Sequence, residues 1–452
     1  MTETARWQAL DRAHHLHPFT DHKALAAVGS RIITSAEGCW LQDSDGNRIL
    51  DGMAGLWCVN IGYGRKELVD AAARQMAELP YYNTFFQSST PPSVELAAKL
   101  AEIAPKGLTR AFFANSGSEA NDTAAKLVRY FWNLEGRPEK KIIIGRKLGY
   151  HGVTMAAASL SGLTPMHPQS DLPLPGFEHV MAPYWYGEGG DLTPEAFAKL
   201  AAADLEERIV QLGADKVAAF IGEPIQGAGG VIIPPEGYWQ EIQAICKRHD
   251  VLLIADEVIS GFGRTGRWWG SDSFGISPDI MTMAKGLSSG YLPISAIMVG
   301  ERVGDVVAES GEEWVHGFTY SGHPVAAAVA LENIRILADE GLAERGSGPI
   351  GEAFAAMLAS LEDHPLVGET RALGLIGAVE LVADKAERRH FPEEREVGLT
   401  CRNHCIRNGL VMRAIRDIMV LSPPLIISEA EIDEIGKRAC KALDLTLADL
   451  NR

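Results

Sequence analysis

Two residues that could act as a nucleophile and as an acid stand at the ends of two apolar runs. Asp256 follows Val251-Leu-Leu-Ile-Ala255, and Lys285 follows Asp279-Ile-Met-Thr-Met283 after one alanine. A carboxylate at the end of a buried strand needs a cationic partner. A lysine in an apolar pocket loses its charge readily and becomes a nucleophile that can form a Schiff base.

A turn of small polar residues offers a place for an anion. Ala111-Phe-Phe-Ala114 is expected to be a short strand, and it runs through Asn115-Ser-Gly-Ser118 into a helix from Glu119 to about Trp132. A turn at a helix N-terminus presents free backbone N–H groups and the positive end of the helix dipole. The same residue types also form an ordinary helix cap, so this turn alone does not decide between the two roles.

These features match the needs of pyridoxal phosphate. Its aldehyde requires a lysine, here Lys285, and its pyridine nitrogen requires an acid that keeps it protonated, here Asp256. Its phosphate would lie on the turn at residues 115–118. The sequence therefore predicts pyridoxal 5'-phosphate as the cofactor.

The chain resembles the class III pyridoxal-phosphate aminotransferases from end to end, and within them the ω-transaminases that use amines and pyruvate. The resemblance lies in ordered motifs, which include Asn115-Ser-Gly-Ser-Glu119, Gly149-Tyr-His-Gly152, Asp256-Glu-Val258, Ala284-Lys-Gly-Leu-Ser-Ser-Gly290 and His316-Gly-Phe-Thr-Tyr-Ser-Gly322. It implies an α/β fold of type I, with a large domain built on a mostly parallel sheet flanked by helices and a smaller α+β domain. It also implies homodimers with active sites at the interface, and a dimer of dimers stays open.

The resemblance implies roles for residues around the cofactor. Lys285 and Asp256 would be catalytic: Lys285 would form the Schiff base and then move a proton, and Asp256 would pair with the pyridinium. Tyr150 and Val258 would enclose the ring, and Thr319 would reach the phosphate from the partner subunit. The expected cofactor-binding residues are Ser116, Gly117, Ser118, Tyr150, His151, Glu223, Asp256, Val258, Lys285 and Thr319. Glu223 is expected to support the site without contacting substrate.

The substrate pocket is expected to join an apolar surface with one arginine. By the same resemblance, the pocket would be lined by Phe19, Trp57, Phe85, Phe86, Tyr150 and Arg413. An arginine can bind the carboxylate of a keto acid bidentately and must move aside for an apolar amine. Arg416 stands three residues later, where many relatives have glycine, so either arginine could bind the carboxylate; Arg413 is favoured.

Two positions bear on the amino acceptor. Relatives that process ornithine or γ-aminobutyrate commonly carry a glutamate and a glutamine where this chain has Ala228 and Ile259. The acidic partner that would hold the arginine aside is therefore missing. This favours an exchange between amines and pyruvate over one that uses 2-oxoglutarate.

Composition limits the classes of molecule that this chain is expected to bind. The 452 residues carry a net charge of −17. Such a charge repels phosphate backbones and anionic lipid, so neither nucleic acid nor a membrane is an expected partner. No apolar run reaches the roughly 20 residues that span a bilayer, and the first seven residues lack an apolar signal core. A cytoplasmic location is expected by default.

No metal site is expected. The six cysteines form no Cys-x-x-Cys pair and are expected to be free thiols. His14, His15 and His17 cluster near the N-terminus. Because we find no acidic or cysteine partner at ligand spacing, we interpret them as an ordinary N-terminal segment.

The elements that must position these residues alternate along the chain. Between about residues 60 and 320, helical stretches alternate with apolar runs at 111–114, 141–144, 217–222, 251–255, 279–283 and 294–299. This alternation favours a mostly parallel sheet, whose ligands lie outside the carboxyl ends of its strands. A hairpin is expected at 37–51, helices at 237–249 and 326–340, and later strands at 375–381 and 418–421. The expected division is 1–59 and 323–452 for the small domain, and 60–322 for the large one.

The sequence therefore predicts an amine:pyruvate aminotransferase. A primary amine or ω-amino acid would give an aldehyde or ketone, and pyruvate would become L-alanine. One alternative is another reaction on the same scaffold: 2-oxoglutarate-dependent aminotransfer of the γ-aminobutyrate or ornithine type, aminomutase or decarboxylase chemistry. A cofactor-binding regulator without catalysis is the other, and the acidic charge and lack of a DNA-reading module argue against it.

Overall fold

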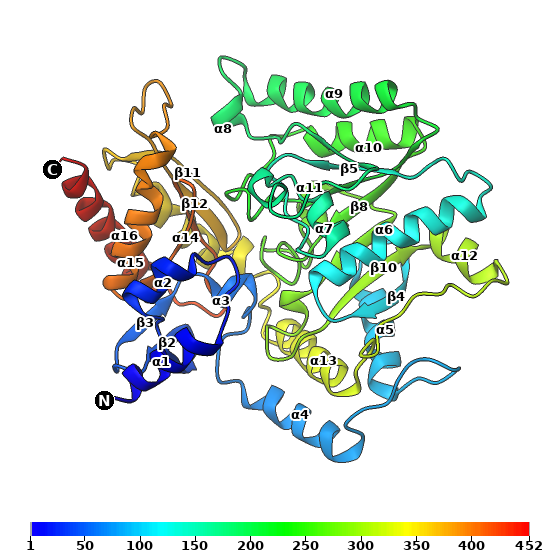
Figure 1. The fold of residues 1–452 in the computed structure, drawn as a ribbon, viewed down its shortest axis with the longest axis horizontal. Helices are drawn as coiled ribbons and strands as arrows, with labels where there is room; N and C mark the ends of the chain where they lie inside the picture. The colour runs from blue at the N-terminus through cyan, green and yellow to red at the C-terminus, as the bar shows by residue number, and fades with distance from the viewer. Residues whose placement is uncertain (1, 452) are drawn as a thin grey trace.

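The computed structural model describes residues 2–451 and contains one large sheet beside two smaller ones. Figure 1 shows the large sheet with its helices on one side of the molecule and the small sheets with both chain termini on the other. Among the described residues, no helix combines the length and apolar character needed to cross a membrane.

The large sheet has seven strands. In spatial order they are β4 (Leu108–Ala114), β10 (Ser295–Gly300), β9 (Ile280–Met283), β8 (Leu252–Asp256), β7 (Val217–Gly222), β5 (Ile142–Arg146) and β6 (Phe177–Val180). Only β10 is reversed, since it pairs antiparallel with both of its neighbours. The carboxyl ends of β4, β8 and β9 therefore meet at one edge, as the sequence predicts. β6, which pairs parallel with β5, is not among the predicted strands.

Helices cover both faces of this sheet because its central strands are apolar on both sides. In β7, Phe220 packs against Trp239 and Phe197 on one face, and Ile221 packs into a cluster with Phe131 on the other. The helices of this region are α4 (Lys66–Glu78), α5 (Pro91–Ile103), α6 (Gly117–Leu134), α7 (Met155–Leu160), α8 (Trp185–Glu188), α9 (Pro194–Leu212), α10 (Tyr238–Arg248), α11 (Gly270–Phe274), α12 (Glu301–Glu309) and α13 (Pro324–Asp339). α9 and α10 cover one face and α6 the other (Figure 1).

One small sheet joins the two ends of the chain. It contains β1 (Ile33–Glu37), β2 (Trp40–Asp43), β3 (Arg48–Asp51) and β13 (Leu410–Val411). Leu410 of β13 is in register with Leu50 of β3, in a parallel pair. The segments 1–59 and 323–452 thus share a sheet; the exact domain division stays a prediction.

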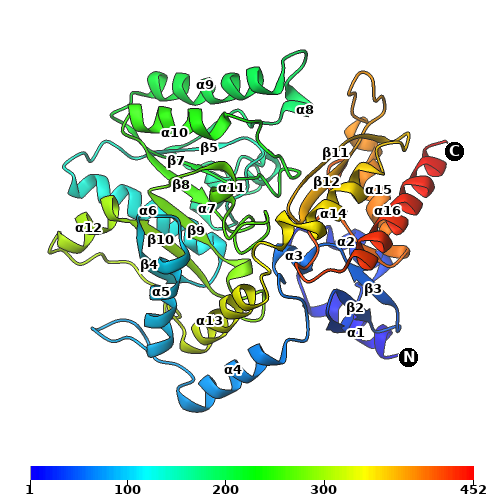
Figure 2. The same ribbon diagram turned by 180° about the vertical axis from the view of Figure 1, so that it is seen from behind.

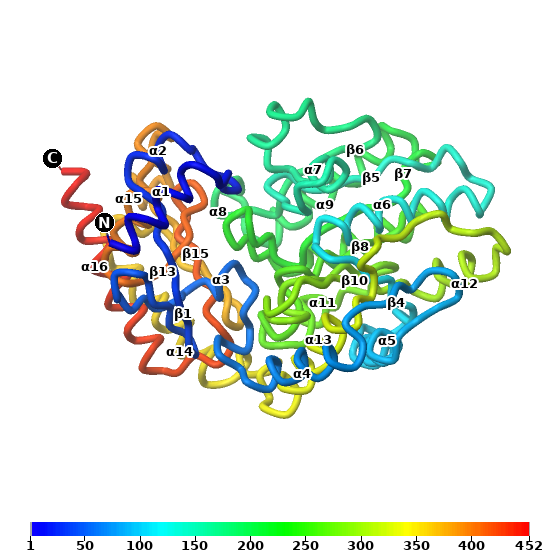
Figure 3. Tube along the Cα trace, turned by 60° about the horizontal axis from the view of Figure 1, so that its bottom comes forward, coloured from blue at the N-terminus to red at the C-terminus, as the bar shows by residue number. Residues whose placement is uncertain are grey.

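The other small sheet is antiparallel and comes from the C-terminal segment. Its strands are β11 (Val367–Leu373), β12 (Ile376–Leu381), β15 (Ile418–Leu421) and β14 (Arg413–Ile415). The helices around the small sheets are α1 (Glu3–His14), α2 (His22–Val28), α3 (Ala54–Trp57), α14 (Pro349–Ala359), α15 (Val397–Arg407) and α16 (Glu429–Leu450). α14 packs on β11, and α15 and α16 pack together (Figure 2). Figure 3 shows both termini at this end of the molecule.

Candidate active site

Asp256 is a buried carboxylate with its hydrogen bonds satisfied. It ends β8 and is 2% exposed. Its Oδ2 accepts a hydrogen bond from Asn121 Nδ2 at 2.8 Å and hydrogen-bonds with His151 Nδ1 at 2.7 Å, while Oδ1 accepts from the Val258 N–H at 3.1 Å. These donors fix the carboxylate and offset the cost of its burial. His151 therefore supports the expected acid.

Lys285 lies just beyond the end of β9 in a strained conformation. Its φ is 37°, in the left-handed region that residues other than glycine rarely adopt. Strain of this kind gathers at functional sites, where the surroundings hold it in place. Burial lowers the pKa of the Lys285 amine. A neutral amine is the nucleophilic form, so this environment suits Schiff-base chemistry.

Lys285 and Arg413 both lie close to the ring of Trp57. Its ring centroid is 5.9 Å from Lys285 Nζ and 4.8 Å from the guanidinium carbon of Arg413. Trp57 is 3% exposed, and within residues 2–451 its buried Nε1 has no hydrogen-bond partner. A buried donor without a partner marks a position where a bound molecule could accept the bond.

The turn that carries Trp57 is held by Asp51 at the end of β3. Asp51 accepts hydrogen bonds from the backbone N–H groups of Met53 at 2.9 Å and Gly55 at 2.6 Å, and from the Tyr63 hydroxyl at 2.7 Å. Trp57 itself has φ 57°. The carboxylate stabilises a turn that would otherwise be strained, and thereby fixes the indole in the pocket.

Arg413 and Arg416 differ in their surroundings. Arg413 begins β14, is half-buried and stacks on Trp57. Arg416 is exposed at the β14–β15 turn with φ 53°. The positive φ explains why glycine suits this position in relatives. Of the two arginines, the structure brings Arg413 to Lys285.

Glu223 holds two loops at the site. The structure buries this carboxylate, and burial raises its pKa. Its Oε1 accepts from the Tyr150 N–H and its Oε2 from the Gly227 N–H, both at 3.0 Å. One side chain therefore links the loop of Tyr150 to the loop that carries Ala228. This position agrees with the supporting role expected for Glu223.

The turn at residues 115–118 is closely packed at the start of α6. The Ser116 hydroxyl accepts from the Glu119 N–H at 3.2 Å, and the Ser118 hydroxyl accepts from the Val153 N–H at 3.0 Å. The amides of the first helical turn have no partner within the helix. A Cβ added at Gly117 would lie 3.1 Å from a Val258 methyl carbon, so only glycine leaves this space open. These features fit a phosphate at the turn and a flat ring near Val258.

Four of the expected site residues lie on the surface instead of in this cluster. Phe19 is 75% exposed, Phe86 is 89% exposed, and Phe85 and Thr319 are exposed as well. The Thr319 carbonyl accepts a hydrogen bond from the Tyr81 hydroxyl at 2.7 Å. Within the single chain, the structure does not bring these residues to Lys285.

Two further groups around the site were missed by the sequence analysis. Asn121 holds both Asp256 and the His151 carbonyl. Arg371 of β11 pairs with Glu380 at 2.6 Å and Glu369 at 2.7 Å, and donates to the carbonyls of residues 230 and 231 at 2.5 and 2.8 Å. It thereby ties the small sheet to the loop next to the pocket. The partners of Asn121 and the carbonyls bound by Arg371 lie far away in sequence.

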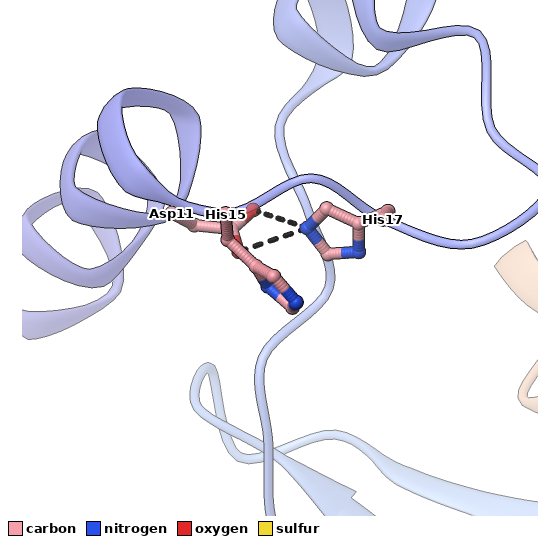
Figure 4. A group of neighbouring side chains, drawn as sticks. All are labelled: Asp11, His15 and His17. Atoms are coloured by element: carbon pink, nitrogen blue, oxygen red, sulfur yellow. Dashed lines mark hydrogen bonds and ion pairs between the residues drawn. The ribbon is translucent and has the colours of Figure 1, made fainter.

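The interpretation of the N-terminal histidines rests on a wrong premise. They do have an acidic partner, since Asp11 contacts both His15 and His17 (Figure 4). Asp11 precedes His15 by four residues, which places both on one side of a helix end. The i,i+4 spacing was the signal that could have revealed this partner.

The family assignment follows from comparison with known proteins. A model of the aminotransferase class-III family matches residues 24–443. The chain is a class III aminotransferase. This family uses pyridoxal phosphate, so the expected cofactor and fold class are both confirmed.

Three known proteins are similar to this chain along nearly their whole length. The aminotransferase is 55% identical over 446 residues to a putrescine–pyruvate aminotransferase of Pseudomonas aeruginosa, covering 99% of this chain and 97% of the relative. A thermostable (S)-enantioselective ω-transaminase of Thermomicrobium roseum has a TM-score of 0.96 at 45% identity, covering 98% and 99% of the two chains. An ω-transaminase of Pseudomonas jessenii, solved with PMP, has a TM-score of 0.95 at 45% identity, with coverage of 97% and 98%.

We predict that Asn121→Ala weakens cofactor retention. Loss of a hydrogen-bond donor to a buried carboxylate costs about 1–3 kcal/mol, so the cofactor dissociation constant should rise roughly tenfold. Equilibrium dialysis followed by cofactor absorbance measures this change. Asn133→Ala, at an exposed position on the same helix, is the matched control. Equal retention in both variants would show that Asn121 does not position Asp256.

Proposed function

We propose that this aminotransferase moves an amino group from a primary amine or ω-amino acid to pyruvate and releases L-alanine. The observation that carries the proposal is the Arg413 guanidinium, stacked on Trp57 in the same pocket as Lys285. Within residues 2–451, Arg413 has no ion-pair partner. Such a cation is suited to the carboxylate of a keto acid.

The surroundings of Arg413 support pyruvate over 2-oxoglutarate. Ile259 packs in an apolar cluster with Trp57 and Ile418. Ala228 is buried in the loop that follows Glu223. Neither residue offers a carboxylate that could hold the arginine away from a substrate. Similarity to a putrescine–pyruvate aminotransferase supports the same choice. The 2-oxoglutarate alternative is less supported.

The cofactor and three side chains would share the chemistry. Pyridoxal phosphate, when bound, supplies an electron sink that makes the carbon bearing the amine acidic. Lys285 Nζ would take the proton from that carbon and deliver it to the C4′ carbon of the cofactor, and it would move a proton in the opposite direction during the second half of the cycle. The Asp256 carboxylate would hold a proton on the pyridine nitrogen, and Arg413 would bind the keto acid carboxylate.

The remaining expected residues would position the cofactor and enclose the substrate. The first-turn amides and hydroxyls of residues 116–118 would bind the phosphate. Val258 and Tyr150 would pack on the ring from opposite sides. The ring of Trp57 would provide an apolar contact surface for the amine. His151 and Glu223 would act on the cofactor through Asp256 and the Tyr150 loop.

A homodimer would complete the site. Exposed aromatic side chains gather on the segments 81–86 and 319–320, and the Tyr81 and Tyr320 rings lie 5.8 Å apart. An exposed apolar patch of this kind is typical of an interface. We propose that Phe19, Phe85, Phe86 and Thr319 line the pocket of the partner subunit. We also propose a cytoplasmic location, and a dimer of dimers stays open.

The half-reaction with amino acids tests the acceptor. When the holoenzyme is mixed with L-alanine, the visible absorbance of its cofactor should be lost, because L-alanine is the product of pyruvate and runs the reverse half-reaction. L-Glutamate should leave the absorbance unchanged under the same conditions. Loss of absorbance with L-glutamate would show that 2-oxoglutarate is the acceptor.

We predict that Arg413→Ala impairs the use of pyruvate while sparing the amine. Charged hydrogen bonds contribute about 1.5–3 kcal/mol, so the KM for pyruvate should rise about 10- to 100-fold. The rate of the half-reaction with a primary amine should change by less than about threefold, since no carboxylate is bound in that step. Stopped-flow measurement of each half-reaction separates the two effects.

Arg416→Ala is the matched control, because Arg416 is exposed and lies three residues away. It should leave both half-reactions near their original rates. An equal loss of both half-reactions in Arg413→Ala, or the pyruvate defect appearing in Arg416→Ala, would contradict the role given to Arg413.

A further inference from the structure

Three side chains with metal-binding atoms meet near the N-terminus, remote in sequence from the residues around Lys285. Asp11, His15 and His17 each offer one ligand atom, and these atoms all lie within 4.8 Å of one another. Asp11 Oδ1 is 3.1 Å from His15 Nδ1, and both Asp11 oxygens are 2.9 Å from His17 Nε2. Figure 4 shows the two imidazoles beside the same carboxylate.

The local chain path explains why they meet. Asp11 lies in the last turn of α1, and His15 follows the helix as its C-terminal cap with φ −118° and ψ 122°. The side chains of alternate residues on an extended chain share one side. His17 accordingly lies beside His15, with the two ring centroids 4.2 Å apart. Its backbone N–H donates to His22 Nε2 at 2.9 Å, which fixes the segment to the start of α2.

The contacts within the cluster are suited to exchange of protons for a cation. Asp11 Oδ1 faces a ring nitrogen of His15, and both Asp11 oxygens face one of His17. Each contact between Asp11 and a ring nitrogen now needs one proton, and a bound cation would take the place of those protons.

We propose that Asp11, His15 and His17 form a binding site for a divalent transition-metal ion of the Zn²⁺ type. Ligand bonds of about 2.0–2.1 Å in a tetrahedral arrangement place neighbouring ligand atoms roughly 3.3 Å apart. The two separations from Asp11, 2.9 and 3.1 Å, need only a small widening, and the ligand atoms of the two histidines lie within 4.8 Å of each other. Three protein ligands leave the fourth position to water or another small ligand.

The donor set selects the class of metal. Two imidazoles and one carboxylate suit Zn²⁺, whereas Ca²⁺ and Mg²⁺ prefer oxygen ligands throughout. The bound ion would fasten the end of α1 to the segment that leads into Phe19, two residues beyond His17. It would thereby order the loop between α1 and α2 from outside the Lys285 pocket.

Metal binding to the untagged, full-length holoenzyme tests the site. After removal of metal with a chelator, equilibrium dialysis against ZnCl₂ followed by elemental analysis should give about one tight Zn²⁺ per chain. Asp11→Asn and His17→Gln should each weaken this binding about tenfold or more, by analogy with the losses seen when metal sites are altered. His14→Gln should bind like the wild type, because His14 is an adjacent exposed histidine outside the cluster.

Limited proteolysis gives a second readout that does not depend on activity. Trypsin can cleave after Arg12 and Lys23, which flank the segment. Zn²⁺ should slow this cleavage at least threefold in the wild type and in His14→Gln, and leave it unchanged in His17→Gln. Unchanged cofactor absorbance and circular dichroism would show that the variants are folded.

Two results would overturn the proposal. One is the absence of a tight Zn²⁺ in the folded wild-type protein. The other is equal Zn²⁺ affinity in the wild type, Asp11→Asn and His17→Gln, which would mean adventitious binding by scattered surface histidines. Failure of either kind would leave the aminotransferase assignment unaffected, because that assignment rests on Lys285, Asp256 and the family match.

Discussion

The buried carboxylate of Asp256 is the constraint on which the rest of the site depends. A charge removed from water must be matched by donors held in place. The structure supplies them from three parts of the chain: the amide of Asn121 on α6, the ring of His151 and the backbone N–H of Val258. This arrangement leaves an oriented acid at the end of β8. The topology of the large sheet places the lysine turn beyond β9 next to it, which is what the cofactor of this family requires.

The site beside Asp256 combines several features, each of which lowers the stability of the fold. A half-buried arginine stacks on a tryptophan without an ion-pair partner among residues 2–451. A lysine in a strained conformation lies near the same ring, with its Nζ 5.9 Å from the ring centroid. Asp51, Glu223 and Arg371 hold the surrounding turns through backbone contacts. Backbone strain and buried groups without partners, when they occur together in one place, indicate a ligand-binding site.

Local pattern predicted the strands and the positions of the two proposed catalytic residues at their ends. β7 of the large sheet and β15 of the C-terminal sheet have the expected bounds. The other expected strands of the large sheet differ from the observed ones by a few residues at most. The short strand β6 was missed because Phe177–Val180 has only four residues and is apolar at its two ends alone, so it forms neither an apolar run nor an alternating pattern. Asp256 and Lys285 were found because each follows its own apolar run.

The partners of these residues could not be found in the same way. Asn121 and Asp256 are separated by 135 positions, and Arg371 and Val231 by 140. Such pairs follow from the three-dimensional path of the chain and leave no local pattern. The exposed positions of Phe19, Phe85, Phe86 and Thr319 were equally beyond sequence patterns. By contrast, the Asp11–His15 spacing was visible and was overlooked.

The most direct test of the account is single turnover by Lys285→Ala holoenzyme. If Lys285 Nζ moves the proton while Asp256 and residues 116–118 hold the cofactor, the variant should keep its cofactor through dialysis. Its conversion of a primary amine should then fall by at least 10²-fold, the usual contribution of a positioned proton-transfer group. Conversion at a rate within about tenfold of the wild type would contradict the central role of Lys285.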